Sequence, residues 1–177
     1  GIGGGSADAG AVIRVINRNF GGNGDIDRLV LATRDLGADV GACIVSETRI
    51  GTGLGWDLQE PEIDDLKGTP VLLVNPRIPL FTGPVFKAWD GIDLGPLPHG
   101  TAREIALAGR NDLEKPAIGL CPEIATMLAA LRATGPMLAR MSGSGATCFA
   151  LYDSIAARDN ARQSLPAGWW TLAGRLR

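Results

Sequence analysis

The chain opens with Gly1-Ile2-Gly3-Gly4-Gly5-Ser6-Ala7-Asp8-Ala9-Gly10, a glycine run that leads directly into a segment with helical spacing. Apolar residues follow at i, i+3, i+4 and i+7, which predicts an amphipathic helix with one stripe packed inward. They are Ala9, Val12, Ile13 and Ile16. Glycine permits positive φ and a close approach of the backbone, and free N–H groups at a helix start carry partial positive charge. The stretch therefore favours a phosphate held by main chain, with Ser6 placed as a helix cap or a metal-binding hydroxyl.

The glycine run fits no nucleotide motif completely. It lacks the Lys-Ser/Thr pair of a Walker loop and the full strand-turn-helix unit of a dinucleotide fingerprint. An ordinary glycine-rich turn therefore stays open as the alternative. Because such a loop normally lies between a strand and its helix, we expect these residues to belong to the rear part of a longer protein.

Composition narrows the classes of function. The 177 residues suffice for one domain or two small ones, with 45% hydrophobic and 20% charged content. No apolar run approaches the roughly 20 residues of a membrane span. The net charge of −2, without a Lys/Arg stripe, argues against a nucleic-acid partner. Three cysteines without CxxC spacing, Cys43, Cys121 and Cys148, indicate reduced, mostly buried thiols in a cytoplasmic protein.

The front of the chain predicts a small helical region and a hairpin. Asp25 is expected to cap a helix whose Ile26, Leu29 and Val30 face inward and which ends at Gly37. Asp39 then stands at a helix exit, followed by an apolar run to Val45 that can enter a sheet. Residues 48–55 are punctuated by glycine and predict a strand or hairpin, and the polar stretch before Gly68 marks a domain boundary.

The rear of the chain alternates strands with helices. Strands are predicted at 70–74, 137–141, 147–152 and 170–173, and helices at 84–89, 122–134 and from Asp153 or Ser154 to Ser164. Residues 90–101 are expected to form a surface loop. This alternation predicts an α+β sandwich of ferredoxin-like type. Residues 142–146 form a second loop of small residues, either a tight strand connection or a ligand loop.

Three blocks of sequence together carry a family resemblance. They are Gly1 to Ala9, Leu36-Gly37-Ala38-Asp39-Val40, and Met141 to Phe149. The chain resembles the GHMP kinase superfamily. With Val74-Asn75-Pro76, Thr82 to Phe86 and Asn111-Asp112-Leu113-Glu114, it is similar to the members that act on a cytidine-diphosphate-linked methylerythritol in non-mevalonate isoprenoid synthesis. The resemblance implies an α+β GHMP kinase fold. Residues 1–68 would be the rear part of a ribosomal S5 domain 2-like ATP-binding domain, and residues 69–177 a ferredoxin-like C-terminal domain.

The resemblance also implies an activity, phosphorylation of the 2-hydroxyl of that small-molecule substrate with ATP and Mg²⁺. Asp39 matches the proton acceptor, Thr82 and Phe86 match substrate contacts, and Phe86 would stack on the cytosine ring. The ATP-binding positions would be Gly1, Ile2, Gly3, Gly4, Gly5, Ser6 and Ala7. Gly143, Ser144 and Gly145 would shape the site, and Ser6 is the one side chain that we consider for the metal.

Two positions depart from the family pattern: Gly41 replaces a proline, and Gly10 replaces an alanine at a cost of about 1 kcal/mol in helix stability. The resemblance places a lysine that assists Asp39, and most remaining cytidine contacts, before Gly1. We therefore expect the 177 residues alone to be inactive and to need the N-terminal segment.

Alternatives remain at the level of the residue and of the whole protein. Asp39 could be a helix-end aspartate satisfied by backbone, and Phe86 could be a core residue. The protein could be another GHMP kinase, of homoserine or mevalonate type, or a noncatalytic nucleotide-binding fragment.

Overall fold

A computed structural model describes residues 2–20 and 24–177, and the chain divides into two compact units. We call Gly3–Asp64, with Gly100–Ala102 and Arg177, the front unit. We call Asp65–His99 and Arg103–Leu176, with Ile2, the rear unit. One predicted site residue lies outside the described residues, Gly1 of the ATP-binding positions.

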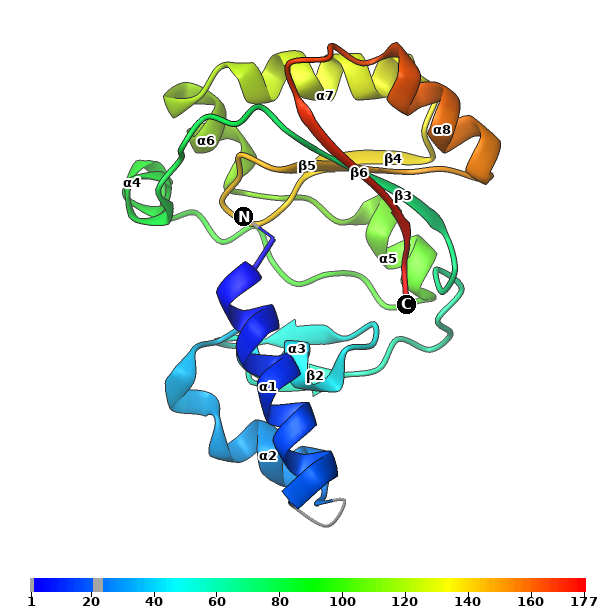
Figure 1. Cartoon of the computed structure of the whole chain (residues 1–177). Coiled ribbons are helices and arrows are strands. Elements are labelled where there is room, and N and C mark those ends of the chain that lie inside the picture. The colour runs from blue at the N-terminus through cyan, green and yellow to red at the C-terminus, as the bar shows by residue number, and fades with distance from the viewer. Residues whose placement is uncertain (1, 21–23) are drawn as a thin grey trace. The chain divides into compact units, whose positions relative to one another are not determined.

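The front unit consists of short helices and a hairpin (Figure 1). Its elements are α1 (Gly4–Phe20), α2 (Ile26–Ala32), the 3-10 turn η1 (Arg34–Leu36), α3 (Val40–Val45), β1 (Ile50–Thr52) and β2 (Asp57–Gln59). Asp25 caps α2 as predicted, since its Oδ1 accepts a hydrogen bond of 2.9 Å from the Asp27 amide. The expected hairpin is also confirmed, because β1 and β2 pair antiparallel.

The prediction of a strand after Asp39 is wrong. Residues 40–45 form helix α3, so Asp39 stands at a helix start and not at a helix exit. Val40 and Ile44, four residues apart, are both buried, as one face of a helix requires. A six-residue apolar run fits a buried strand and a buried helix equally well by periodicity, which explains the error.

The inward stripe expected for α1 is likewise not observed. Val12 and Ile16 are 57% and 52% exposed, and Gly10 is the buried residue of the helix. A Cβ built on Gly10 would lie 2.8 Å from the backbone carbon of Cys43 in α3. Helix α1 therefore packs through its glycine face, because only glycine allows two helix backbones to approach this closely.

The rear unit is a four-stranded antiparallel sheet with order β4-β5-β3-β6. Its strands are β3 (Pro70–Asn75), β4 (Leu138–Met141), β5 (Cys148–Leu151) and β6 (Trp170–Arg175). Its helices are α4 (Thr82–Ala88), α5 (Ala102–Ala108), α6 (Glu114–Leu120), α7 (Glu123–Ala133) and α8 (Ile155–Ser164). Helices follow the first and third strands, so the ferredoxin-like prediction is confirmed.

The core of the rear unit lies between this sheet and two helices. Figure 1 shows α7 and α8 over the same face of the sheet. Alternate strand residues such as Leu72 and Val74 point into that layer and are fully buried. The inward stripe predicted for α7 is confirmed, since all its members are buried: Ile124, Met127, Leu128 and Leu131. Ser154 caps α8, accepting a hydrogen bond from the Ala157 amide at 3.1 Å.

The predicted surface loop is also confirmed: residues 90–99 are exposed and lack regular structure. Within the described ranges, no helix combines the length and the apolar character that a membrane crossing requires.

Candidate active site

Helix α1 presents an open N-terminus. Its first intrahelical hydrogen bond runs from the Ala7 amide to the Gly3 carbonyl, 2.8 Å away. The amides of Gly4, Gly5 and Ser6 precede that bond and are free of the helical ladder. A Cβ built on Gly4 or Gly5 would meet no atom within 4 Å. The helix start therefore offers donors and open space, the two features that an anion requires there.

Ser6 is not the cap of this helix. It lies in the first turn of α1, and Gly3 precedes the helix with a φ of 62°. This φ lies in the left-handed region, where glycine is favoured. The glycine run thus makes the turn that opens the helix, while the hydroxyl of Ser6 remains a candidate for a ligand or metal contact.

Asp39 lies beside this helix start. A Cβ built on Gly3 would stand 4.0 Å from Oδ2 of Asp39. Asp39 is exposed, and although it occupies the cap position of α3, its side chain makes no capping hydrogen bond. The carboxylate of Asp39 therefore makes no capping hydrogen bond to α3. This finding speaks against the alternative in which nearby backbone groups satisfy the side chain.

The position of α3 against α1 is fixed by two residues of α1. Gly10 permits the close approach to Cys43, and Arg14 donates hydrogen bonds to the carbonyls of Cys43 and Ile44, the latter at 3.4 Å. These carbonyls lie near the end of α3, where a cation is favourable. Burial raises the pKa of the Cys43 thiol, and the charge of Asp39 raises it further. Cys43 is thus a packing residue and a poor nucleophile.

The departures from the family pattern have a packing reason. A Cβ on Gly41 would lie 3.0 Å from Cγ1 of Val30, so a proline there would press on α2. Gly10 and Gly41 together allow α1, α2 and α3 to pack closely. The contact of Arg14 with α3 has no signature in the sequence, because a contact between residues 29 positions apart leaves no local pattern.

The rear unit holds the second small-residue loop, which joins β4 to β5. Gly143 and Gly145 have φ of 53° and 81°, and a Cβ on Gly145 would lie 2.8 Å from Sδ of Met141. The hydroxyls of Ser144 and Thr82 are 3.0 Å apart and share a hydrogen bond. The structure therefore brings together Thr82, predicted as a substrate contact, and the loop predicted to shape the site.

Phe86 lies on α4 together with Thr82. Its side chain is 53% exposed, whereas its neighbour Val85 is fully buried and supplies the inward face of the helix. The interpretation of Phe86 as a core residue is therefore wrong. An exposed ring on the helix that carries Thr82 is available for stacking, and that contact stays a prediction.

Asn111 and Glu114 belong to the block Asn111-Asp112-Leu113-Glu114, whose sequence pattern indicates no role for either residue. Nδ2 of Asn111 donates to the carbonyls of Met141 and Gly143, at 2.9 and 2.8 Å. Oε2 of Glu114 accepts from the Met141 amide at 3.3 Å. Both side chains thus hold the strand end and loop that carry Gly143 and Ser144.

The described ranges, 2–20 and 24–177, contain no group of three or more His, Cys, Asp or Glu side chains placed to hold a metal ion. Mg²⁺ in kinases is commonly held by one or two protein groups together with substrate phosphates, so such a cluster is not required.

The three cysteines are free thiols, as predicted, and burial raises the pKa of Cys148 to about 12.

Comparisons with known proteins agree with this fold and with the three sequence blocks. The family model "GHMP kinases C terminal" matches residues 98–169 of the chain. Along its whole length it is similar to proteins named 4-diphosphocytidyl-2-C-methyl-D-erythritol kinase. The relative from Novosphingobium aromaticivorans is 62% identical over 100% of this chain, and the one from Sphingopyxis alaskensis is 53% identical over 100%. The predicted resemblance is confirmed.

Solved structures agree with this assignment. A crystal structure of 4-(cytidine 5'-diphospho)-2C-methyl-D-erythritol kinase superposes with a TM-score of 0.78 at 30% identity, covering 97% of this chain and 64% of that one. A homoserine kinase from Cytophaga hutchinsonii, at 15% identity and a TM-score of 0.59 over 77% of this chain and 50% of its own, shares the fold. The chain spans 61% and 64% of the two relatives' lengths.

Proposed function

We propose that the complete protein containing these residues transfers a phosphoryl group from ATP to the 2-hydroxyl of 4-diphosphocytidyl-2-C-methyl-D-erythritol. The observation that carries the proposal is the carboxylate of Asp39 beside Gly3, at the open N-terminus of α1. The names of the relatives and of the solved kinase support the choice of substrate. Phosphoryl transfer needs fixed donors for phosphate oxygens and a group that accepts the hydroxyl proton.

At the start of α1, the amides of Gly4, Gly5 and Ser6 donate to the phosphate oxygens, and Ile2, Gly3 and Ala7 complete the loop. Asp39 accepts the proton of the attacking hydroxyl, and its lack of a capping bond leaves its oxygens available. ATP would supply the phosphoryl group, and Mg²⁺ bound to its phosphate oxygens would neutralise their charge. Ser6 is the side chain that we propose as a metal contact.

In the rear unit, the exposed ring of Phe86 stacks on cytosine and the Thr82 hydroxyl contacts the substrate. The hydrogen bond between Thr82 and Ser144 orients that hydroxyl. Gly143 and Gly145 adopt positive φ, and the loop that they form with Ser144 follows a path that side chains at these two glycines would obstruct. A homoserine or mevalonate acceptor would use no stacking ring, so Phe86 favours the cytidyl substrate over these alternatives.

Replacement of Asp39 tests the proposal. Asp39→Asn in the complete protein removes the proton acceptor with little change of shape, so turnover should fall by about 10²- to 10⁴-fold. The affinity for ATP should change little, because the phosphate donors are main-chain amides. Steady-state kinetics and a nucleotide titration measure the two effects.

The matched control is Asp25→Asn. Asp25 also occupies a helix cap position, but its carboxylate bonds the Asp27 amide, and asparagine caps equally well. Turnover should be unchanged in this control. Near-normal turnover of Asp39→Asn would remove Asp39 from the mechanism.

A further inference from the structure

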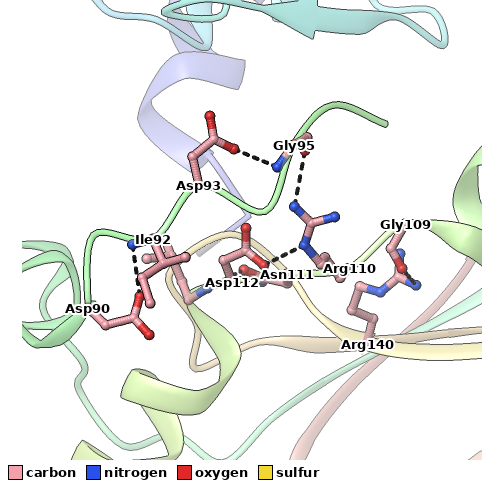
Figure 2. Close-up of polar contacts among 10 residues, drawn as sticks. Asp90, Ile92, Asp93, Gly95, Gly109, Arg110, Asn111, Asp112 and Arg140 are labelled. Carbon is pink, nitrogen blue, oxygen red and sulfur yellow. Dashed lines mark hydrogen bonds and ion pairs between the residues drawn. The ribbon is translucent and has the colours of Figure 1, made fainter. Parts of the chain in front are cut away.

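One segment of the rear unit sends successive side chains to different loops. Arg110 donates from Nη2 to the Gly95 carbonyl at 3.1 Å and from Nε to Asp112 at 2.8 Å, contacts drawn in Figure 2. Asn111 instead reaches the loop after β4, through the carbonyls of Met141 and Gly143. Adjacent residues therefore serve separate loops, and either contact can be altered without the other.

Both polar atoms of the Asn111 side chain are hydrogen-bonded. Its amide nitrogen makes the two donated bonds, while Oδ1 accepts from the Leu113 amide at 3.0 Å. That last bond closes a local turn, which fixes the direction of the side chain. Asn111 is thus a rigid donor, aimed at two carbonyls that flank Ser142.

Glu114, at the start of α6, also bonds the backbone of Met141. Its Oε2 accepts from the Met141 amide at 3.3 Å, and its Oε1 lies 3.6 Å from Nη2 of Arg132 on α7. The amide of Met141 and its carbonyl are therefore both bonded to side chains of one short stretch. On the far side of the loop, Nδ2 of Asn75 donates to Oγ1 of Thr147 at 2.9 Å.

We propose that Asn111, supported by Glu114, is a positioning residue that fixes the Gly143–Ser144 backbone and thereby the Ser144 hydroxyl that orients Thr82. The inference rests on the proposed function, because Thr82 is there a substrate contact. Asn111 does not touch the substrate. Its contribution reaches the acceptor through the Gly143 carbonyl, Ser144 and the shared hydrogen bond with Thr82. A change at Asn111 should therefore raise the KM for the acceptor substrate more than the KM for ATP.

Asn111→Asp is the sharpest variant. The introduced carboxylate keeps the acceptor for the Leu113 amide but opposes the Met141 and Gly143 carbonyls with an acceptor instead of a donor. Asn111→Ser is the second variant, since its hydroxyl can accept from the Leu113 amide but is too short to reach the loop. Asp112→Asn is the matched control: the amide oxygen still accepts from Arg110, and the loop after β4 is untouched.

Two measurements on the complete protein test the inference. Hydrogen exchange of the peptide covering residues 142–147 should become about tenfold faster in Asn111→Asp and in Asn111→Ser, and stay unchanged in Asp112→Asn. The KM for 4-diphosphocytidyl-2-C-methyl-D-erythritol should rise about tenfold, while the KM for ATP changes less than about twofold. Thermal unfolding shows whether Asn111→Asp is merely unstable. If it is, the results for Asn111→Ser test the inference.

Unaltered exchange in both Asn111 variants would overturn the inference while leaving the proposed function intact. Faster exchange with an unchanged KM for the acceptor would also overturn it. A parent protein that does not phosphorylate the acceptor would instead remove the proposed function, and the exchange data would show separately whether Asn111 holds the loop.

Discussion

At the scale of single residues, Phe86 had two possible roles, stacking on cytosine or packing in the core, and the exposure of its ring favours stacking. Phe86→Leu keeps most of the apolar volume and removes the ring face, so the KM for the cytidyl substrate should rise about tenfold, the size expected for one stacked base. The KM for ATP and the unfolding temperature should hardly change, because Phe86 is 53% exposed. Phe81→Leu, in an exposed phenylalanine five positions earlier, is the control. A loss of stability without a change in KM would return Phe86 to a packing role.

At the scale of elements, the N-terminus of α1 is tested by Gly4→Val. The new side chain would meet no protein atom within 4 Å of its Cβ, so the fold should be retained. It would occupy the space in front of the free amides, and the affinity for ATP should fall at least tenfold, or about 1.4 kcal/mol. Gly119→Val in α6, where the surroundings are equally open, should leave ATP binding unchanged. Unaltered affinity in Gly4→Val would make the glycine run a structural turn.

The elements also show what could be predicted from the sequence. Strands β3 and β5 are short, largely buried apolar runs, and the stripe of α7 follows a period of 3.6, so these patterns were sufficient. Helix α3 was missed because six apolar and small residues show too little of either period. The contacts of Arg14 and Asn111 could not be predicted, because each joins a side chain to backbone carbonyls about 30 positions away.

At the scale of the whole molecule, the two units differ in how much apolar surface they bury. The rear unit has a continuous core, whereas in the described residues of the front unit Val40, Ile44 and Ala102 are the buried apolar side chains. Phe20 and Leu36 are 85% and 65% exposed. Limited proteolysis of the 177-residue chain should therefore digest the front and leave a resistant product that starts between Asp65 and Gly68. Equal resistance of both units would contradict this difference in stability.

The central claim concerns the reaction, and a product assay with the complete protein tests it most directly. ATP and Mg²⁺ are supplied with 4-diphosphocytidyl-2-C-methyl-D-erythritol, homoserine or mevalonate, and phosphorus NMR follows the products. We predict a new phosphate monoester on the 2-hydroxyl of the cytidyl substrate and no product from the other two acceptors. A monoester formed only on homoserine or mevalonate, or ATP binding without transfer to any of the three, would contradict the account.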